Sequence, residues 1–122
     1  MSCSPQEFLS LARKLCNSSE EIERRCSVSR AYYAALHWAR ERQDRCPEVH
    51  RDTIQGGTHE EVIQRFLQHT ESTTAKRIGY MLRDMRNKRE SADYELSGLC
   101  VESDAQYQIS AAERIKALVD KV

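Results

Sequence analysis

The chain has 122 residues, of which 39% are hydrophobic, and its 19 basic side chains (Lys and Arg) balance 19 acidic ones. A chain of this length builds a single hydrophobic core, which excludes a multidomain enzyme. Its formal net charge of zero argues against a protein that coats nucleic acid through bulk charge. Any contact with a nucleic acid therefore has to be made at a local basic site.

The sequence carries no sign of a membrane segment, a signal peptide or a bound metal. No apolar stretch approaches the roughly 20 residues that span a bilayer, and the first residues lack the basic and apolar regions of a signal peptide. The five cysteines are odd in number and have no CxxC pair, and the four histidines are scattered. Walker, GxGxxG and HExxH motifs are absent. These features predict a soluble cytoplasmic protein without a metal or another cofactor.

Helix starts are marked where Ser or Thr is followed three positions later by Glu or Gln, because such a pair can form a capping box. Boxes of this kind begin at Ser4, Ser18, Thr58 and Ser103. Together with apolar residues spaced by three and four, they predict five helices. The predicted helices cover approximately residues 4–16, 18–43, 58–69, 73–90 and 103–121.

Two connections stand out between these helices. Residues 44–57 contain Pro47 and the pair Gly56-Gly57, and this stretch is long for a bundle connection, so it is either mobile or functional. Residues 91–102 are predicted to form a turn or an irregular stretch. The sequence as a whole predicts one all-α domain, a compact up-and-down antiparallel bundle of about five helices.

The second predicted helix has apolar residues around about half of its circumference, which is typical of a central, heavily buried helix. Arg30, Tyr33 and His37 lie at the edge of this apolar face and project the same way, because they are spaced by three and seven residues. They are either boundary residues satisfied by neighbouring helices or part of a ligand site. The apolar half includes Ile22, Cys26, Val28, Tyr32, Ala35, Leu36 and Ala39.

The fourth predicted helix places an arginine on its apolar stripe. The stripe of Ile78, Met81, Leu82 and Met85 continues to Arg89, with Arg86 and Asp93 on its flank. A buried Arg is costly unless it is paired, and Asp93 is the nearest candidate partner. Alternatively, Arg83, Arg86 and Arg89 form a recessed cationic site that grips a phosphate bidentately.

His59 follows Thr58 in the first turn of the third predicted helix. The helix dipole disfavours a cation at this position. We therefore expect His59 to be a neutral surface or interface residue rather than a ligand.

Several of these segments resemble the HEPN domain (higher eukaryotes and prokaryotes nucleotide-binding). They are the run SRAYYAALH from Ser29 to His37, then His59, and finally Leu82-Arg83 with the following Arg86, Arg89 and Ala92-Asp93-Tyr94. The chain looks most like small standalone bacterial and archaeal members, and the resemblance extends over approximately residues 5–120. It implies an up-and-down bundle of four or five helices.

The resemblance also implies a chemistry. Many HEPN proteins are metal-independent ribonucleases, often toxins or defence effectors, with an Arg-x4–6-His motif at a homodimer interface, where Arg neutralises phosphate and His acts as acid or base. Residues 88–96, where that His would fall, contain none. The spacing recurs as Arg30-x6-His37, on a predicted helix. If this protein cleaves RNA, we expect His37 or His59 to be the acid or base and Arg86 with Arg89 to hold the phosphate.

Three functions follow from these observations. The first is a HEPN-fold homodimer that binds RNA or a nucleotide, in a toxin–antitoxin or defence module with a minimal nucleotidyltransferase as its partner antitoxin. The second is a metal-independent endoribonuclease toxin with a displaced His. The third is a non-catalytic structural adaptor, in which Arg89 is buried and paired. The residues predicted to contact RNA or nucleotide are Arg30, Tyr33, Arg83, Arg89, Asp93 and Tyr94, and the resemblance also makes Tyr94 a candidate for modification by the partner.

Overall fold

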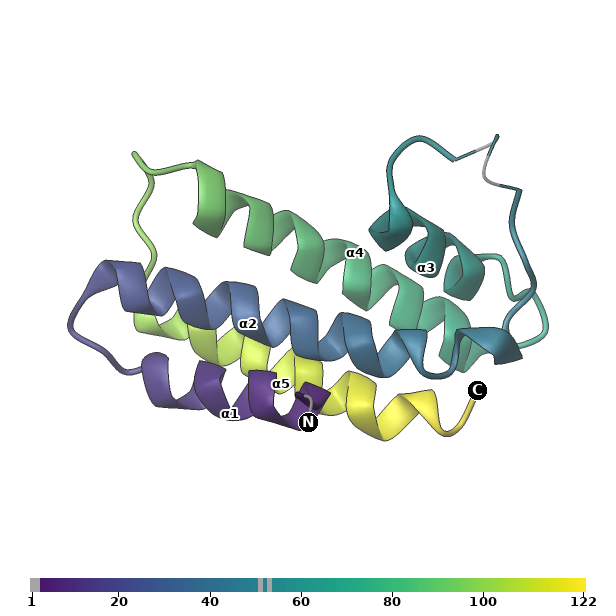
Figure 1. Ribbon diagram of the computed structural model, residues 1–122, viewed down its shortest axis with the longest axis horizontal. Helices are drawn as coiled ribbons and strands as arrows, with labels where there is room; N and C mark the ends of the chain where they lie inside the picture. Colours follow the sequence, from purple (N-terminus) through teal and green to yellow (C-terminus); the bar gives the residue numbers. More distant parts are fainter. Residues whose placement is uncertain (1–2, 51, 53) are drawn as a thin grey trace.

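The computed structural model describes residues 3–50, 52 and 54–122, and this part of the chain forms helices without any strand. Five α-helices and a short 3-10 helix pack around one core, which confirms the predicted all-α bundle (Figure 1). Residues 1, 2, 51 and 53, which belong to the predicted N-terminal region and to the 44–57 connection, lie outside the described residues. The elements are α1 (Pro5–Leu15), α2 (Glu21–Arg40), η1 (Gln43–Arg45), α3 (Thr58–Leu67), α4 (Thr73–Tyr94) and α5 (Glu102–Val119).

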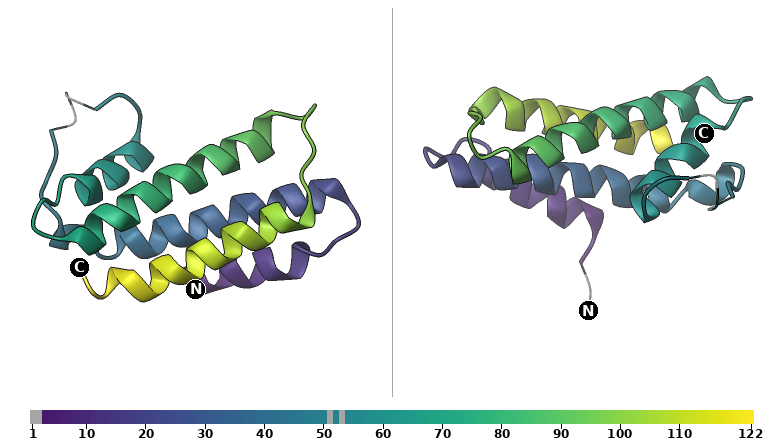
Figure 2. Two further views of the ribbon diagram at one scale, coloured as in Figure 1. Left: turned by 180° about the vertical axis from the view of Figure 1, so that it is seen from behind. Right: turned by 90° about the horizontal axis from the view of Figure 1, so that it is seen from above.

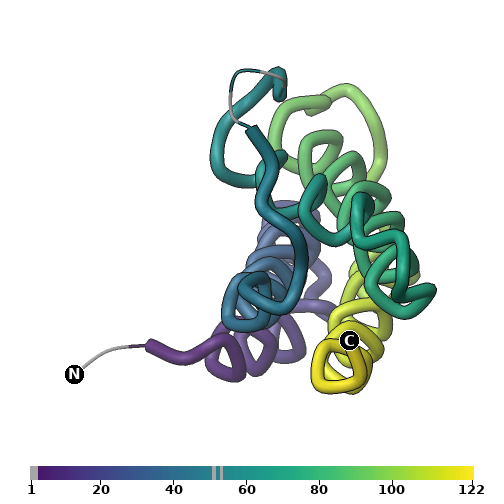
Figure 3. The backbone as a smooth tube through the Cα atoms, turned by 90° about the vertical axis from the view of Figure 1, so that its right-hand side faces the viewer, coloured from purple at the N-terminus to yellow at the C-terminus, as the bar shows by residue number. Residues whose placement is uncertain are grey.

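Helix α2 lies at the centre of the bundle and packs against α1, α4 and α5. The first and fourth helices run antiparallel to α2, whereas α5 runs in the same direction as α2 (Figures 1 and 2). The short helix α3 packs mainly against α4. The end-on view in Figure 3 separates the connection between α2 and α3, at the top, from α1 and α5 at the bottom. The fold therefore leaves α3 as an addition to a four-helix body.

The middle of α2 is buried because its small residues let the neighbouring helices approach closely. Ala31, Ala34 and Ala35 are completely buried, and Tyr32 is buried among them. This confirms the prediction of a central helix.

The first turns of α2 differ from the prediction that its apolar half is buried throughout. Ile22 is 65% exposed and Cys26 is also exposed. The inward position in these turns is taken by Arg25, which is only 7% exposed. A helical wheel cannot anticipate this exchange, because the partner of Arg25 comes from a connection about 70 residues further along the chain.

Arg25 fastens the C-terminal end of α4 to α2. Its guanidinium donates to the carbonyl oxygens of Ala92 at 2.8 Å, Glu95 at 3.2 Å and Gly98, and it forms an ion pair with Glu21 at 2.8 Å. The last carbonyls of a helix lack partners within the helix, and a guanidinium offers enough donors to satisfy several of them at once. Arg25 is therefore a structural residue with a nearly complete set of partners.

The capping boxes predicted at the first two helix starts have different outcomes. Ser4 forms its box: its hydroxyl accepts the Glu7 N–H, while the Glu7 carboxylate accepts the Ser4 N–H. The box at Ser18 was predicted wrongly, because α2 begins at Glu21 without a side-chain cap and the Ser18 hydroxyl binds the Glu23 carboxylate instead.

The starts of α3 and α5 also differ from the predicted boxes. Thr58 is already helical, and the residue before α3 is Gly57, which has no side chain to cap with. Helix α5 begins one residue early, because the Asp104 carboxylate accepts the N–H of Val101 at 2.8 Å. Adjacent hydroxyl and acidic residues offer several competing caps, and the packing of the helix decides which one forms.

Helix α4 is longer than its predicted core. The Ser72 hydroxyl caps its start by accepting the Ala75 N–H, and the helix continues to Tyr94, so only residues 95–101 of the predicted irregular stretch lack helical structure. This extension puts Arg89 and Asp93 one turn apart on the same helix. Over the described ranges, we find no helix with both the length and the apolar character needed to cross a bilayer.

Candidate functional site

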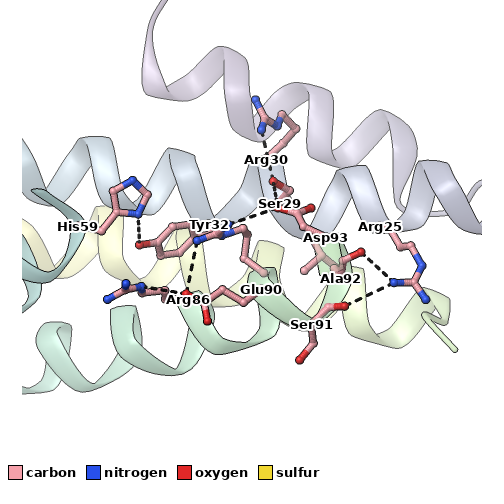
Figure 4. Close-up of polar contacts among 12 residues, drawn as sticks. Arg25, Ser29, Arg30, Tyr32, His59, Arg86, Glu90, Ser91, Ala92 and Asp93 are labelled. Atoms are coloured by element: carbon pink, nitrogen blue, oxygen red, sulfur yellow. Dashed lines mark hydrogen bonds and ion pairs between the residues drawn. The ribbon is translucent and has the colours of Figure 1, made fainter. Parts of the chain in front are cut away.

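The structure brings most of the predicted site residues together where α2, α3 and α4 meet. Helix α2 supplies Arg30 and Tyr32, α3 supplies His59, and α4 supplies Arg86 and Asp93 (Figure 4). Tyr33 of α2 contacts Arg30 and Arg89. We call this group the arginine cluster. Its members are Arg30, Tyr32, Tyr33, His59, Glu60, Arg83, Arg86, Arg89, Glu90 and Asp93.

Arg89 lies at the centre of the arginine cluster and is 9% exposed. Its guanidinium carbon is 5.6 Å from the centre of the Tyr32 ring and 5.8 Å from that of Tyr33, distances at which a cation is attracted to an aromatic ring. Its ion pairs are long, with Nη1 3.5 Å from Asp93 Oδ2 and Nη2 3.7 Å from Glu90 Oε1. Its buried Nε has no hydrogen-bond partner within the part of the chain that the structure describes.

The charge of Arg89 persists despite its burial. Burial opposes the charged form, but Tyr33, Asp93 and Tyr32 outweigh that cost and raise the pKa of the guanidinium above its ordinary value. A buried cation that is held mainly by long ion pairs and aromatic rings retains donors for a further acceptor.

Arg30 extends the cluster towards α1. Its guanidinium carbon is 5.1 Å from the centre of the Tyr33 ring and 5.6 Å from that of Phe8, while Nη2 lies 3.3 Å from the Ser29 hydroxyl. Tyr33 is thus in contact with both Arg30 and Arg89. Two cations are therefore linked through one partly buried aromatic ring.

His59 bridges α3 to α2, as an interface residue. Its Nδ1 is 3.1 Å from the Tyr32 hydroxyl (Figure 4), and its ring centre is 5.6 Å from that of Tyr33. Burial lowers the pKa of His59, and the nearby charges of Arg89 and Arg86 lower it further. His59 is therefore neutral at neutral pH.

The hydroxyl of Tyr32 fixes how neutral His59 is oriented. Burial raises the pKa of Tyr32, so its phenol stays protonated and can donate to Nδ1 of His59. In this arrangement, Nε2 of His59 carries the ring proton.

His37 lies beside the cluster rather than in it. Its ring centre is 5.2 Å from that of Phe8, the same ring that Arg30 contacts, so the Arg30-x6-His37 pattern is joined through a residue of α1. Burial lowers the pKa of His37, and Arg40 adds to this effect. The charge of His37 also contributes to the lowered pKa of His59, but only after those of three arginines.

Carboxylates neutralise much of the positive charge. The pair of Asp93 with Arg89 was expected from the sequence, whereas the contacts of Glu60 and Glu90 were not. Glu60 lies 2.6 Å from Arg86 and 3.7 Å from Arg83, and Glu90 lies 3.3 Å from Nε of Arg86. The side chain of Arg83 is 44% exposed, so it is not recessed as expected. The carboxylates of Glu60, Glu90 and Asp93 therefore pair with three guanidinium groups of the cluster, those of Arg83, Arg86 and Arg89. The fourth, that of Arg30, contacts aromatic rings instead.

Tyr94, a predicted site residue, lies apart from the arginine cluster, and the sequence does not point to several residues that contact the cluster. Tyr94 is the last residue of α4 and is 75% exposed. The sequence pattern marks Tyr32 only as an apolar position. It does not distinguish Glu60, because Glu61 completes the predicted capping box. Phe8 gave no signal, because the distance along the chain to its partners on α2 is more than 20 residues.

The described part of the chain contains no group of three or more His, Cys, Asp or Glu side chains arranged to hold a metal ion. A cavity of about 360 Å³ lies beside the C-terminal half of α4, where its lining includes Arg25, Lys88 and Leu99. None of the residues of the arginine cluster lines this cavity.

Fold and site thus define a small all-α bundle whose polar residues converge on a buried arginine flanked by tyrosines. No protein-family model, curated protein or solved structure matches the chain. The likeness to HEPN domains rests on the segments around Arg30 and Asp93, and it remains a prediction.

Proposed function

We propose that this protein binds a phosphate-bearing ligand, RNA or a nucleotide, at the arginine cluster. The observation that carries the proposal is the state of Arg89. Its guanidinium is buried and charged, its two ion pairs span 3.5 and 3.7 Å, and its Nε lacks a partner among the described residues. A buried charge normally has close partners, so this guanidinium retains donors for an anionic oxygen.

The neighbours of Arg89 suit a nucleotide. A guanidinium can present two parallel donors to phosphate oxygens, and Arg86 and Arg30 add positive charge on either side of Arg89. The partly buried ring of Tyr33 supplies an aromatic surface, on which bases stack in many single-stranded nucleic-acid sites. A focal site of this kind also agrees with the chain's net charge of zero.

The wider setting of this proposal rests on the resemblance to HEPN domains alone. It comprises a homodimer, a place in a toxin–antitoxin or defence module, and a minimal nucleotidyltransferase as the partner. Light scattering after size exclusion tests the homodimer directly.

A second candidate function is metal-independent cleavage of RNA, and the position of His59 favours it. His59 is neutral and lies close enough to Arg86 and Arg89 for their charges to lower its pKa. To accept the proton of a ribose 2′-hydroxyl while the arginines hold the phosphate, His59 has to adopt the other tautomer, in which Nδ1 donates to the Tyr32 hydroxyl and Nε2 is the acceptor.

The adaptor alternative remains distinct from both. The burial of Arg89 agrees with a structural role, whereas its long ion pairs and unpartnered Nε favour binding. If Arg89 only supports the fold, replacing it will reduce stability and leave ligand binding unchanged.

Fluorescence anisotropy with a labelled single-stranded RNA oligonucleotide in EDTA tests the binding proposal. We expect Arg89→Met to weaken binding at least about tenfold, equivalent to about 1.4 kcal/mol, and to reduce the salt slope by about one. Arg114→Met on α5 is the matched control, because Arg114 is exposed and lies outside the arginine cluster. Equal affinity of the Arg89→Met and wild-type proteins would exclude the proposed site.

The same samples test cleavage. Incubation of the RNA in EDTA, followed by gel analysis, should show products with the wild-type protein if the second candidate is correct. We expect His59→Gln to remove them, whereas His37→Gln retains most of the activity, because His37 packs on Phe8 outside the cluster. Intact RNA at every protein concentration would exclude cleavage of this substrate and leave binding as the function.

A further inference from the structure

The carboxylate of Glu60 already occupies part of the arginine cluster. Its Oε2 lies 2.6 Å from Nη1 of Arg86, and its Oε1 lies 3.7 Å from Nη2 of Arg83. Nε2 of Gln64, one turn further along α3, donates to the same carboxylate at 2.9 Å. The side chain of Glu60 is only 16% exposed, so it is the least solvated of the acidic groups in the cluster.

Carboxylate and phosphate oxygens are interchangeable partners for a guanidinium, because both offer two acceptors in a similar geometry. While Glu60 binds Arg86 at this short distance, the Nη1 of Arg86 is not available to a phosphate. A phosphate approaching Arg86 also meets the negative charge of Glu60 at close range and in a partly buried setting, where the repulsion is screened less than in water.

The position of Glu60 in the chain allows it to leave Arg86 without disturbing the core. Glu60 lies in the first turn of α3, three residues after Gly57, and Gly56 has a φ of 120° that favours glycine. The residues that anchor α3 in the core, Val62, Ile63 and Phe66, all come later in the helix. A change in the Glu60 rotamer therefore leaves the hydrophobic contacts of α3 in place.

We propose that Glu60 is an internal competitor, which occupies Arg86 in the free protein and has to be displaced before a phosphate binds there. This inference rests on the proposed binding function. The affinity of the arginine cluster for a phosphate then depends on the competition between two anions, the Glu60 carboxylate on α3 and the phosphate of the ligand. Release of Glu60 on binding removes one contact of the first turn of α3, while His59 in the same turn keeps its contact with Tyr32.

Glu60→Gln tests the competition, because it removes the negative charge and keeps the shape of the side chain. We expect this variant to bind the labelled RNA oligonucleotide about five- to tenfold more tightly than wild type. Glu113→Gln is the matched control, because Glu113 forms an ion pair with Arg13 at 3.0 Å on another part of the bundle. This control should bind as wild type does. Glu60→Asp keeps the charge but shortens the reach to Arg86, and we expect a smaller gain.

A double-mutant cycle tests whether the effect passes through Arg86. In an Arg86→Met background, Glu60→Gln should give no gain. One outcome separates the two proposals. If the wild-type protein binds RNA and Arg89→Met weakens that binding, but Glu60→Gln does not raise the affinity, then the proposal that Glu60 competes is wrong and the binding function stands. If no variant binds, both proposals fail. If Glu60→Gln is unfolded by circular dichroism, the prediction for Glu60→Asp decides, and an affinity at or below that of wild type overturns the competition.

Discussion

Two arginines of this protein are buried to nearly the same degree and have very different surroundings. Arg25 is 7% exposed, and its guanidinium reaches four carbonyl oxygens and a carboxylate, with distances of 2.8 Å to Ala92 and Glu21. Arg89 is 9% exposed, and it has ion pairs of 3.5 and 3.7 Å, two aromatic rings and an Nε without a partner among the described residues. Burial alone therefore does not distinguish a structural arginine from a binding one.

The difference follows from where each guanidinium meets α4. Arg25 reaches the end of α4, where the last carbonyls have no partner within the helix and accept its donors. Arg89 belongs to α4 itself and projects against α2, whose carbonyls are already used by the helix. Only side chains remain as acceptors for Arg89. The nearest carboxylates, at 3.5 and 3.7 Å, are too far away to satisfy all the donors of its guanidinium. Arg65 and Arg86 also have a buried Nε without a hydrogen-bond partner among the described residues. Arg89 is therefore marked for a ligand by the combination of this Nε with deep burial and long ion pairs.

The largest predicted effect is at the structural arginine. Arg25→Met leaves the carbonyls of α4 and the 95–101 connection without their shared donor, and it leaves Glu21 without its partner. We expect a loss of about 3–5 kcal/mol in the free energy of unfolding, measured by urea denaturation. RNA affinity should not change under conditions where the variant is folded. A loss below about 1 kcal/mol would contradict the structural role.

Gly79→Ala is expected to have the next largest effect, because it disturbs the contact that seats α3 beside the arginine cluster. An added Cβ would lie 2.7 Å from Cγ and Cδ2 of Leu67 on α3, and 3.0 Å from its backbone nitrogen. We expect a loss of about 1–2 kcal/mol in urea denaturation, because overpacking outweighs the better helix propensity of Ala. Gly98→Ala, at the Arg25 end, is the control, because its Cβ would meet only the Glu95 carbonyl at 3.5 Å. Equal stability of the two variants would refute this account.

Acid should weaken the arginine cluster before it weakens the Arg25 end, because the cluster region contains histidines. The pKa values of His59 and His37 are lowered from 6.5, so the folded protein binds fewer protons than the unfolded chain below that pH. The free energy of unfolding is thus retained above about pH 6.5 and falls as the pH drops through the lowered values. Urea denaturation from about pH 7.5 to about pH 5 measures this slope. His59→Gln should flatten it, and an unchanged slope would show that His59 does not contribute.

The smallest effect on stability is expected at Arg89, which sharpens the contrast with Arg25. Arg89→Met replaces a poorly paired buried charge with an apolar chain of similar length, while the Asp93 side chain remains 32% exposed. We expect the free energy of unfolding to change by no more than about 1 kcal/mol in either direction. A loss as large as that of Arg25→Met would make Arg89 a structural residue and favour the adaptor function.

Part of the candidate site was accessible from the sequence. The spacing of Arg30, Tyr33 and His37 and the position of Arg89 on an apolar stripe follow from helical periodicity, and the structure places these residues where the periodicity predicts. Glu60 could not be recognised in this way. It pairs with Arg86, 26 residues away, and nothing in the local pattern of α3 distinguishes it from the neighbouring Glu61.

The sequence by itself determined the helices, their approximate bounds and the burial of α2, because a 3.6-residue period and the alanines of α2 depend only on local chain geometry. The tertiary structure alone decided which carboxylates approach the arginines, that Phe8 joins Arg30 to His37, and that Arg25 rather than Ile22 faces inward. Those features arise from contacts between separate helices, and the packing of the bundle fixes the partners only when all the helices are in place.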